Sequence, residues 1–323
     1  MLEQDWGRRQ ALVELDLATI NMLARPAFPG HQVIGAELLT EGHCNTNYKL
    51  TLAGLDKPFV LRVYRRDQAS SQKDRDLYQL VQGRVPVPRM LYHDDSCQHL
   101  AWPYTIMTWV EGILLRDAIE KGDAREQSSY GYAVGSTLAA IGSFTFPQAG
   151  FFGPDLHVEP FTGNESYLQL IRHFLTTGPT QERLGPELSQ RLWNFVEAQH
   201  DYLDALPHTA ALVHSDFKGI NILVHEGEVS AVLDWEFAFA GSPLTDIANM
   251  LRYEHRMPEA FVSQFLRGYQ VQGGVLPPDW HRCIKLLDLI SLCEFAHAPE
   301  VNEVVVRDVI ELMERTLAQY QEK

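Results

Sequence analysis

The chain has 323 residues, and its 27 Lys and Arg against 42 Asp and Glu give a formal net charge of −15 at pH 7. The length suffices for one large domain or two modest ones, and 45% hydrophobic residues are typical of a globular protein. The acidic balance argues against nucleic acid or an anionic membrane as partner, because both are polyanions. No apolar run approaches the roughly 18 residues of a membrane span, and the N-terminus lacks the apolar core of a signal peptide. We therefore expect a cytoplasmic protein, with its four cysteines as reduced thiols.

The negative charge is concentrated in one part of the chain. Residues 1–110 hold 12 Lys and Arg and 12 Asp and Glu, so the whole excess lies in residues 111–323. Such asymmetry indicates two parts with different roles.

The first part is predicted to be rich in strands. Apolar spacing favours a helix over 11–24, and alternating or β-branched runs favour strands. The strands are expected at 32–39, 48–53 and 58–64, with a turn at 54–58, then a helix at 70–82 and extended segments at 89–93 and 104–110.

The second part is predicted to be mainly helical, with two strands at 221–224 and 230–235. Its helices are expected at 114–121, 124–144, 165–175, 186–205, 243–254, 258–273, 280–297 and 301–321. A small strand-rich lobe therefore precedes a larger helical lobe, and the cleft between two such lobes is a common ligand site.

The strongest chemical signal is the run from His214 to Asn221, which leads into a strand and is followed by Asp234. Its His-x-Asp-x₄-Asn spacing is that of the kinase catalytic loop. Phosphoryl transfer needs a carboxylate near the attacking hydroxyl, and amide and carboxylate oxygens that hold Mg²⁺. The residues Asp216, Asn221 and Asp234 are of the types that this chemistry requires.

From residue 35 to residue 255 the chain resembles the aminoglycoside phosphotransferase and choline kinase-like family. Besides the catalytic loop, the resemblance rests on 42–48, 85–88, 107–112 and 241–246. It implies an α+β, bilobal, protein-kinase-like fold: an antiparallel-sheet, nucleotide-binding lobe at 1–110 and a helical lobe with the catalytic and acceptor sites at 111–323.

The resemblance also implies roles for individual residues. Asp216 and Lys218 would be catalytic, Asn221 and Asp234 would bind Mg²⁺, and His214 and Asp246 would brace the loop. ATP, or alternatively GTP, would be held by Gly42, Asn45, Arg62, Asp76, Thr108 and Val110. Gly42 permits close approach to phosphate, although one glycine is also typical of an ordinary hairpin turn.

Two positions depart from the kinase pattern. Arg62 stands where kinases have Lys, and Asp76 is the expected partner in place of the usual Glu. Lys218 stands where many family members carry His, and a cation there can neutralise charge on the transferred group. The alternatives are a solvated strand residue for Arg62 and a surface lysine for Lys218.

The acidic second lobe is expected to hold the acceptor, and its carboxylates would attract a cationic small molecule. The candidates are Glu236, Glu254, Asp288, Glu294, Glu300 and Glu303, each with a solvated helix face as the alternative. Trp235, Tyr253 and Trp280 would stack on the acceptor or pack in the core. The sequence thus predicts an ATP- and Mg²⁺-dependent small-molecule O-phosphotransferase. A nucleotide-binding pseudokinase that acts as a scaffold is the alternative, because of Arg62.

Overall fold

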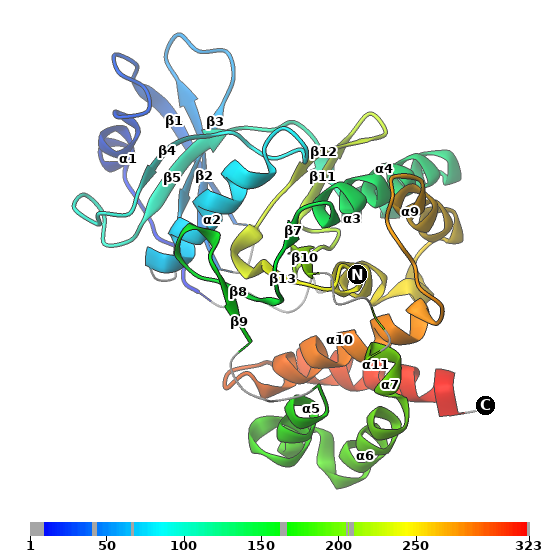
Figure 1. Cartoon of the computed structure of the whole chain (residues 1–323). Helices are drawn as coiled ribbons and strands as arrows, with labels where there is room; N and C mark the ends of the chain where they lie inside the picture. Colours follow the sequence, from blue (N-terminus) through cyan, green and yellow to red (C-terminus); the bar gives the residue numbers. More distant parts are fainter. Residues whose placement is uncertain are drawn as a thin grey trace.

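The structure is a computed structural model that describes residues 10–40, 44–65, 68–161, 167–204, 206 and 210–321. A small lobe built on an antiparallel sheet sits beside a larger, mainly helical lobe (Figure 1). This arrangement confirms the α+β, two-lobed fold that the sequence predicted.

The small lobe is a five-stranded antiparallel sheet with one helix against it. Its strands follow the order β1-β2-β3-β5-β4. Their bounds are Val33–Leu39 for β1, Thr46–Leu52 for β2, Phe59–Val63 for β3, Met90–Asp94 for β4 and Tyr104–Thr108 for β5. The register places Asn47 opposite Arg62, so these two side chains can meet on one face.

Helix α1 (Leu17–Ala24) is shorter than the sequence predicted. It begins at Leu17 because the side chain of Asp16 accepts a hydrogen bond from the N–H of Thr19 at 2.8 Å and caps the first turn. The buried Ile20 and Leu23 pack on the sheet and complete the core of the small lobe.

Helix α2 (Gln68–Val81) joins the two lobes. Its apolar face contains Leu77, Tyr78 and Val81, and these residues belong to the core of the large lobe rather than to that of the small one. The helix lies between the sheet of the small lobe and the short strands of the large lobe (Figure 1). Residues on its buried face therefore face the junction between the lobes.

Two short sheets form the centre of the large lobe. The first has the order β12-β11-β6 and the second the order β7-β10-β13-β8-β9. Their bounds are Ile113–Leu114 for β6, Thr145–Phe146 for β7, Gly150–Phe152 for β8, Val158–Pro160 for β9, Ala210–Val213 for β10, Ile222–His225 for β11, Glu228–Val232 for β12 and Phe239–Gly241 for β13. The sequence predicted β11 and β12 but not the short strands β6–β10 and β13, because two to four residues carry too little periodicity to be recognised.

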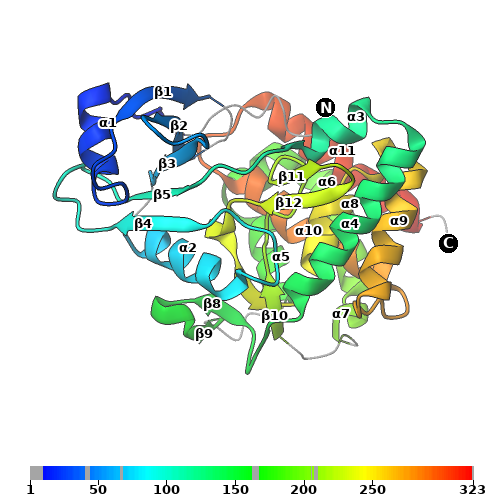
Figure 2. The same cartoon turned by 90° about the horizontal axis from the view of Figure 1, so that it is seen from above.

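Helices surround these sheets. They are α3 (Leu115–Lys121), α4 (Ala124–Gly142), α5 (Tyr167–Thr176), α6 (Gly178–Gln199), α7 (Asp201–Asp204), α8 (Leu244–Leu251), α9 (Glu259–Val271), α10 (Trp280–His297) and α11 (Glu303–Gln321), with 3₁₀ turns η2 (Pro154–Leu156), η3 (Trp235–Phe237) and η4 (Glu254–Arg256). Helices α4 and α9 lie side by side (Figure 2). Their backbones approach so closely that a methyl group at Gly135 would overlap the carbonyl of Phe265.

A second core lies among α5, α6, α10 and α11, at the side of the large lobe away from the five-stranded sheet of the small lobe (Figure 1). Helix α6 begins at Gly178, eight residues before the predicted start at Pro186. The chain kinks at Gly185, whose φ of 73° lies in the left-handed region, so the predicted start is that of the segment after the kink. Helix α10 has the predicted bounds. Among the helices of the described residues, none is both long enough and apolar enough to cross a membrane.

Candidate active site

The loop from His214 to Asn221 connects β10 to β11 and is held in place by Asp246 near the start of α8. The carboxylate of Asp246 accepts hydrogen bonds from the backbone N–H groups of His214 and Ser215, both at 2.8 Å. Ser215 has a φ of 68°, a strained conformation that these bonds sustain. Burial raises the pKa of Asp246 to about 7, although both hydrogen bonds act in the opposite direction.

The ring of His214 fixes the position of the next segment. Its Nε2 lies 2.8 Å from the carbonyl of Leu233, and its Nδ1 accepts the backbone N–H of Asp216 at 3.2 Å. Since Nδ1 accepts, the ring is neutral with its proton on Nε2, in agreement with a pKa that burial lowers. Trp235 packs against this ring, with 4.7 Å between the two ring centroids, and is fully buried, so this tryptophan belongs to the core.

Asp216 lies at the centre of the loop and contacts both predicted neighbours. Its Oδ2 accepts a hydrogen bond from Nδ2 of Asn221 at 2.6 Å, and its Oδ1 lies 2.8 Å from Nζ of Lys218. Burial opposes ionisation of Asp216, but Lys218 outweighs it, and the pKa of this carboxyl lies below its ordinary value. Asp216 is therefore an anion at neutral pH, and Lys218 is not a solvated surface lysine.

Asp234 is brought to the catalytic loop by the end of β12. The N–H of Leu233 donates to the carbonyl of Asn221 at 2.8 Å, which fixes the two segments together. Asp234 itself has a φ of 61°, which turns the chain from β12 into η3. Carboxylate and amide oxygens at these two positions form the kind of donor set that Mg²⁺ prefers, so Asn221 and Asp234 fit a magnesium ion.

Arg62 on β3 of the small lobe contacts Asp234 of the large lobe. Its guanidinium donates from Nε to Oδ1 of Asn47 at 3.1 Å and forms an ion pair through Nη2 with the carboxylate of Asp234. The residue is only 6% exposed, so the alternative of a solvated strand residue is wrong. Arg62 connects the sheet of the small lobe directly to the predicted metal site.

The predicted pairing of Arg62 with Asp76 is wrong, because Asp74 takes that place. Oδ2 of Asp74 lies 3.7 Å from Nη1 of Arg62 and also accepts the hydroxyl of Tyr64 at 2.7 Å. Asp76 instead pairs with its neighbour Arg75, 2.7 Å from Nη2. Burial raises the pKa of Asp74 to about 6, although Arg62 acts in the opposite direction.

Helical spacing could have identified Asp74. Leu77, Tyr78 and Val81 form the buried face of α2, and Asp74 precedes them by three, four and seven residues. Residues with that spacing share one face of a helix, whereas Asp76 points to another. The motif order along the chain does not contain this information.

The other predicted nucleotide contacts lie in or next to the small lobe. Asn45 is buried, and its Nδ2 lies 3.5 Å from Oε2 of Glu236, while Oγ1 of Thr108 accepts the N–H of Arg89 at 2.9 Å. Val110 lies in the connector between the lobes. Gly42 lies outside the described residues. The roles of these four residues in nucleotide binding stay predictions.

Of the predicted acceptor carboxylates, the structure brings Glu254 and Asp288 to one cavity, while the other four do not line it. Asp288 is buried and pairs with Arg252, whose Nη2 lies 2.7 Å from Oδ1. Glu254 pairs with Lys285 at 2.7 Å, while Glu236 lies buried beside Asn45. The remaining candidates are exposed, namely Glu294, Glu300 and Glu303. The prediction for Asp288 and Glu236 is therefore corrected: they are partners of Arg252 and Asn45, because helices α8 and α10 and turn η3 bury them.

Comparison with known proteins agrees with this geometry. The model of the phosphotransferase enzyme family matches residues 35–286. The chain belongs to this family, and its class is that of small-molecule kinases. This confirms the family that the sequence resemblance indicated.

The chain is also similar to individual known proteins. It is 25% identical over 259 residues to hygromycin-B 4-O-kinase of Escherichia coli, and this match covers 73% of this chain and 72% of the relative. It is 30% identical over 173 residues to acyl-CoA dehydrogenase family member 11 of Gallus gallus, and this match covers 52% of this chain but only 21% of that protein. The crystal structure of aminoglycoside phosphotransferase APH(4)-Ia shares the fold, with a TM-score of 0.71 and 18% identity over 94% of this chain and 99% of the other.

Proposed function

We propose that the protein transfers the γ-phosphoryl group of ATP to a hydroxyl group of a small molecule. The observation that carries the proposal is the convergence of Asp216, Asn221 and Asp234 in front of Arg62, at the junction of the two lobes. Solved relatives include a ternary complex of APH(4)-Ia with AMP-PNP and hygromycin B, which supports nucleotide use. GTP is the alternative donor.

Asp216 orients the acceptor in this proposal. Its carboxylate is an anion held by Asn221 and Lys218, so one oxygen accepts the proton of the acceptor hydroxyl. The hydroxyl oxygen bonds to the γ-phosphorus as the bond to the β–γ bridging oxygen breaks, and the proton passes through Asp216 to solvent. Lys218 then lies where it can stabilise charge on the transferred group.

Asn221 and Asp234 would hold Mg²⁺ in this site. Such an ion supplies charge neutralisation on the nucleotide phosphates. Arg62 already contacts Asp234, and its guanidinium would donate hydrogen bonds to both this carboxylate and the phosphates. In this proposal the side chain of Arg62 therefore takes the role of the usual kinase lysine, which is to contact the nucleotide phosphates.

A pseudokinase scaffold is less well supported. Arg62 was the feature that favoured it, and the structure gives Arg62 three partners in the site, Asn47, Asp74 and Asp234. The family match and the complete set of catalytic-loop side chains favour turnover.

The acceptor is a hydroxyl compound of small size. Similarity to hygromycin-B 4-O-kinase supports the finer prediction of a cationic, polyhydroxylated molecule. The pairing of Asp288 and Glu254 with basic side chains counts against a cationic one.

The test is formation of ADP and of a phosphorylated product across a panel of hydroxyl compounds, with GTP and Mg²⁺-free reactions as comparisons. An Asp216→Asn variant should lose about 10²–10⁴-fold in turnover while it still binds ATP. Asp204→Asn, on an exposed residue of α7, is the matched control and should keep full activity. Tight ATP binding with no turnover on any acceptor would support the scaffold instead.

A further inference from the structure

A cavity of about 460 Å³ lies between η4, α10 and α11, away from the nucleotide contacts. This volume suits a small molecule or a substantial part of one. Its charged lining residues are Arg252, Glu254, Lys285, Asp288 and Arg315, and two histidines, His255 and His281, line it as well.

The two carboxylates in this wall are already neutralised. Asp288 accepts two hydrogen bonds from Arg252, at 2.8 Å from Nε and 2.7 Å from Nη2. Glu254 lies 2.7 Å from Nζ of Lys285 and 2.9 Å from Nε2 of His281. These partners hold the pKa of Glu254 at about 2 in spite of its partial burial, so the carboxylate stays ionised and paired. An incoming cation would have to displace these contacts.

The lining holds one more Lys or Arg than carboxylates, and the carboxylate partner of that extra residue, Arg315, is Glu311, which lies outside the lining. Three Lys and Arg residues face two carboxylates, and two histidines add to the positive side when protonated. This balance is the reverse of the chain as a whole, with its net charge of −15. Arg315 on α11 is half exposed, with Nε at 3.2 Å from Oε1 of Glu311, and its long side chain can turn toward a ligand.

The cavity shares a wall segment with a second hollow, which lies at the catalytic loop. This smaller hollow is lined by Lys218, Gly219 and Ile220 of the loop, and by Arg116, with no carboxylate in its lining. The segment from Asn249 to Met257 contributes side chains to both hollows, so it connects the cavity to the loop.

We propose that the cavity binds an anionic group, a carboxylate or a phosphate, that the acceptor carries at a distance from its reacting hydroxyl. Basic side chains recognise such groups through charge-assisted hydrogen bonds. This inference rests on the proposed function, and it specifies the acceptor as an anionic hydroxyl compound rather than a cationic one.

The first experiment compares acceptors in matched pairs with the full chain, ATP and Mg²⁺. Glycerol 3-phosphate is paired with glycerol, and 3-hydroxybutyrate with 1,3-butanediol, while choline and hygromycin B represent cations. The anionic member of a pair should have a kcat/KM at least about tenfold higher, the value of one charge-assisted contact. Phosphate and carboxylate compounds in separate arms show which anion the cavity prefers.

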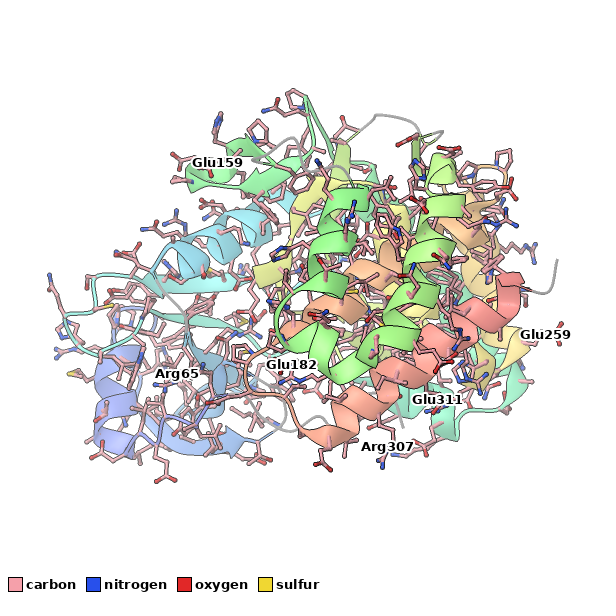
Figure 3. The ribbon with its side chains drawn as sticks, turned by 90° about the horizontal axis from the view of Figure 1, so that it is seen from below. Arg65, Glu159, Glu182, Glu259, Arg307 and Glu311 are labelled. Carbon is pink, nitrogen blue, oxygen red and sulfur yellow. The ribbon has the colours of Figure 1, made fainter. Side chains whose placement is uncertain are left out.

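The second experiment changes the wall. Arg315→Glu should raise the KM for the anionic acceptor about tenfold or more and leave the KM for ATP unchanged. Arg307→Glu is the control, because Arg307 lies on the same helix, is exposed and points away from the molecule (Figure 3). Thermal shifts with the same anionic compounds in the presence of ADP give a readout without turnover, and Arg315→Gln serves if Arg315→Glu is unstable.

The outcomes separate this inference from the proposed function. If the preference for anionic acceptors is lost in Arg315→Glu and kept in Arg307→Glu, the result supports the cavity as the binding site for the anionic group. Transfer that depends on Asp216 but favours choline or hygromycin B overturns the cavity assignment and leaves the proposed function standing. Absence of Asp216-dependent transfer to any compound, with no thermal stabilisation by the anions, overturns both.

Discussion

Replacement of Arg62 by Lys restores the usual kinase residue, yet we expect it to weaken nucleotide binding. The guanidinium of Arg62 contacts Asn47, Asp74 and Asp234 at once, from three different nitrogens. A lysine has one nitrogen on a stem that ends nearer the strand, so it loses at least one of these contacts. A charge-assisted hydrogen bond contributes about 1.5–3 kcal/mol, which corresponds to a roughly 10- to 100-fold weaker Kd for ATP.

Two measurements check this expectation. Titration calorimetry gives the Kd for ATP, and chemical unfolding gives the free energy of unfolding, which should fall by a similar amount because Asp74 keeps less of its pairing. Arg84→Lys, on an exposed residue after α2, is the control and should change neither value. An Arg62→Lys variant with a Kd within about twofold of the unchanged protein would refute the reasoning.

A double variant tests the geometric cause. In the pair of Arg62 and Asp74, a long basic side chain faces a short acidic one. Arg62→Lys combined with Asp74→Glu shortens the basic side chain and lengthens the acidic one. The pair should recover at least half of the lost binding free energy, since contacting residues are coupled. Equal or greater loss in the double variant would show that length compensation is not the reason for Arg62.

Three further predictions concern the catalytic loop. Lys218→Ala should lower kcat about 100-fold or more with little change in the KM for ATP, and unchanged turnover would return Lys218 to a structural role. Asp234→Asn should raise the Mg²⁺ concentration for half-maximal activity about tenfold, and chelation with EDTA should stop the reaction; activity without Mg²⁺ would contradict the metal assignment. Burial raises the pKa of Asp246 to about 7, above its ordinary 3.8, so the free energy of unfolding should fall as pH rises between these two values. Asp246→Asn should make that fall shallower in urea unfolding at several pH values, and an equally steep fall would assign the pH dependence to other groups.

The sequence was informative where chemistry is encoded in short spacings. The order His214, Asp216, Asn221 and Asp234 is read within one stretch of chain, and the structure places these residues together because one loop and the adjacent hairpin carry them all. Long periodic helices such as α10 were predicted with correct bounds, since many turns repeat the same pattern.

The sequence misled where a partner comes from a distant element. Asp76 seemed the natural partner of Arg62, but the rotation of α2 against the large lobe buries Asp74 and leaves Asp76 beside Arg75. The cationic acceptor that the acidic composition predicted stays a prediction, because composition counts charges without their pairing. Arg252 meets Asp288, and Lys285 meets Glu254, only because α8 and α10 pack together.

Composition and local patterns were enough to predict the class of the fold, to single out the loop from His214 to Asn221, and to give the net charge of −15 with its concentration beyond residue 110. These depend on composition and on residues that are close along the chain. The pairing of these charges is a tertiary property, and the cavity between η4, α10 and α11 brings three Lys and Arg residues together with two carboxylates inside a lobe that is acidic overall. An ion pair is a relation between side chains in space, and in the pairs Arg252–Asp288 and Glu254–Lys285 the partners are more than thirty residues apart in the chain.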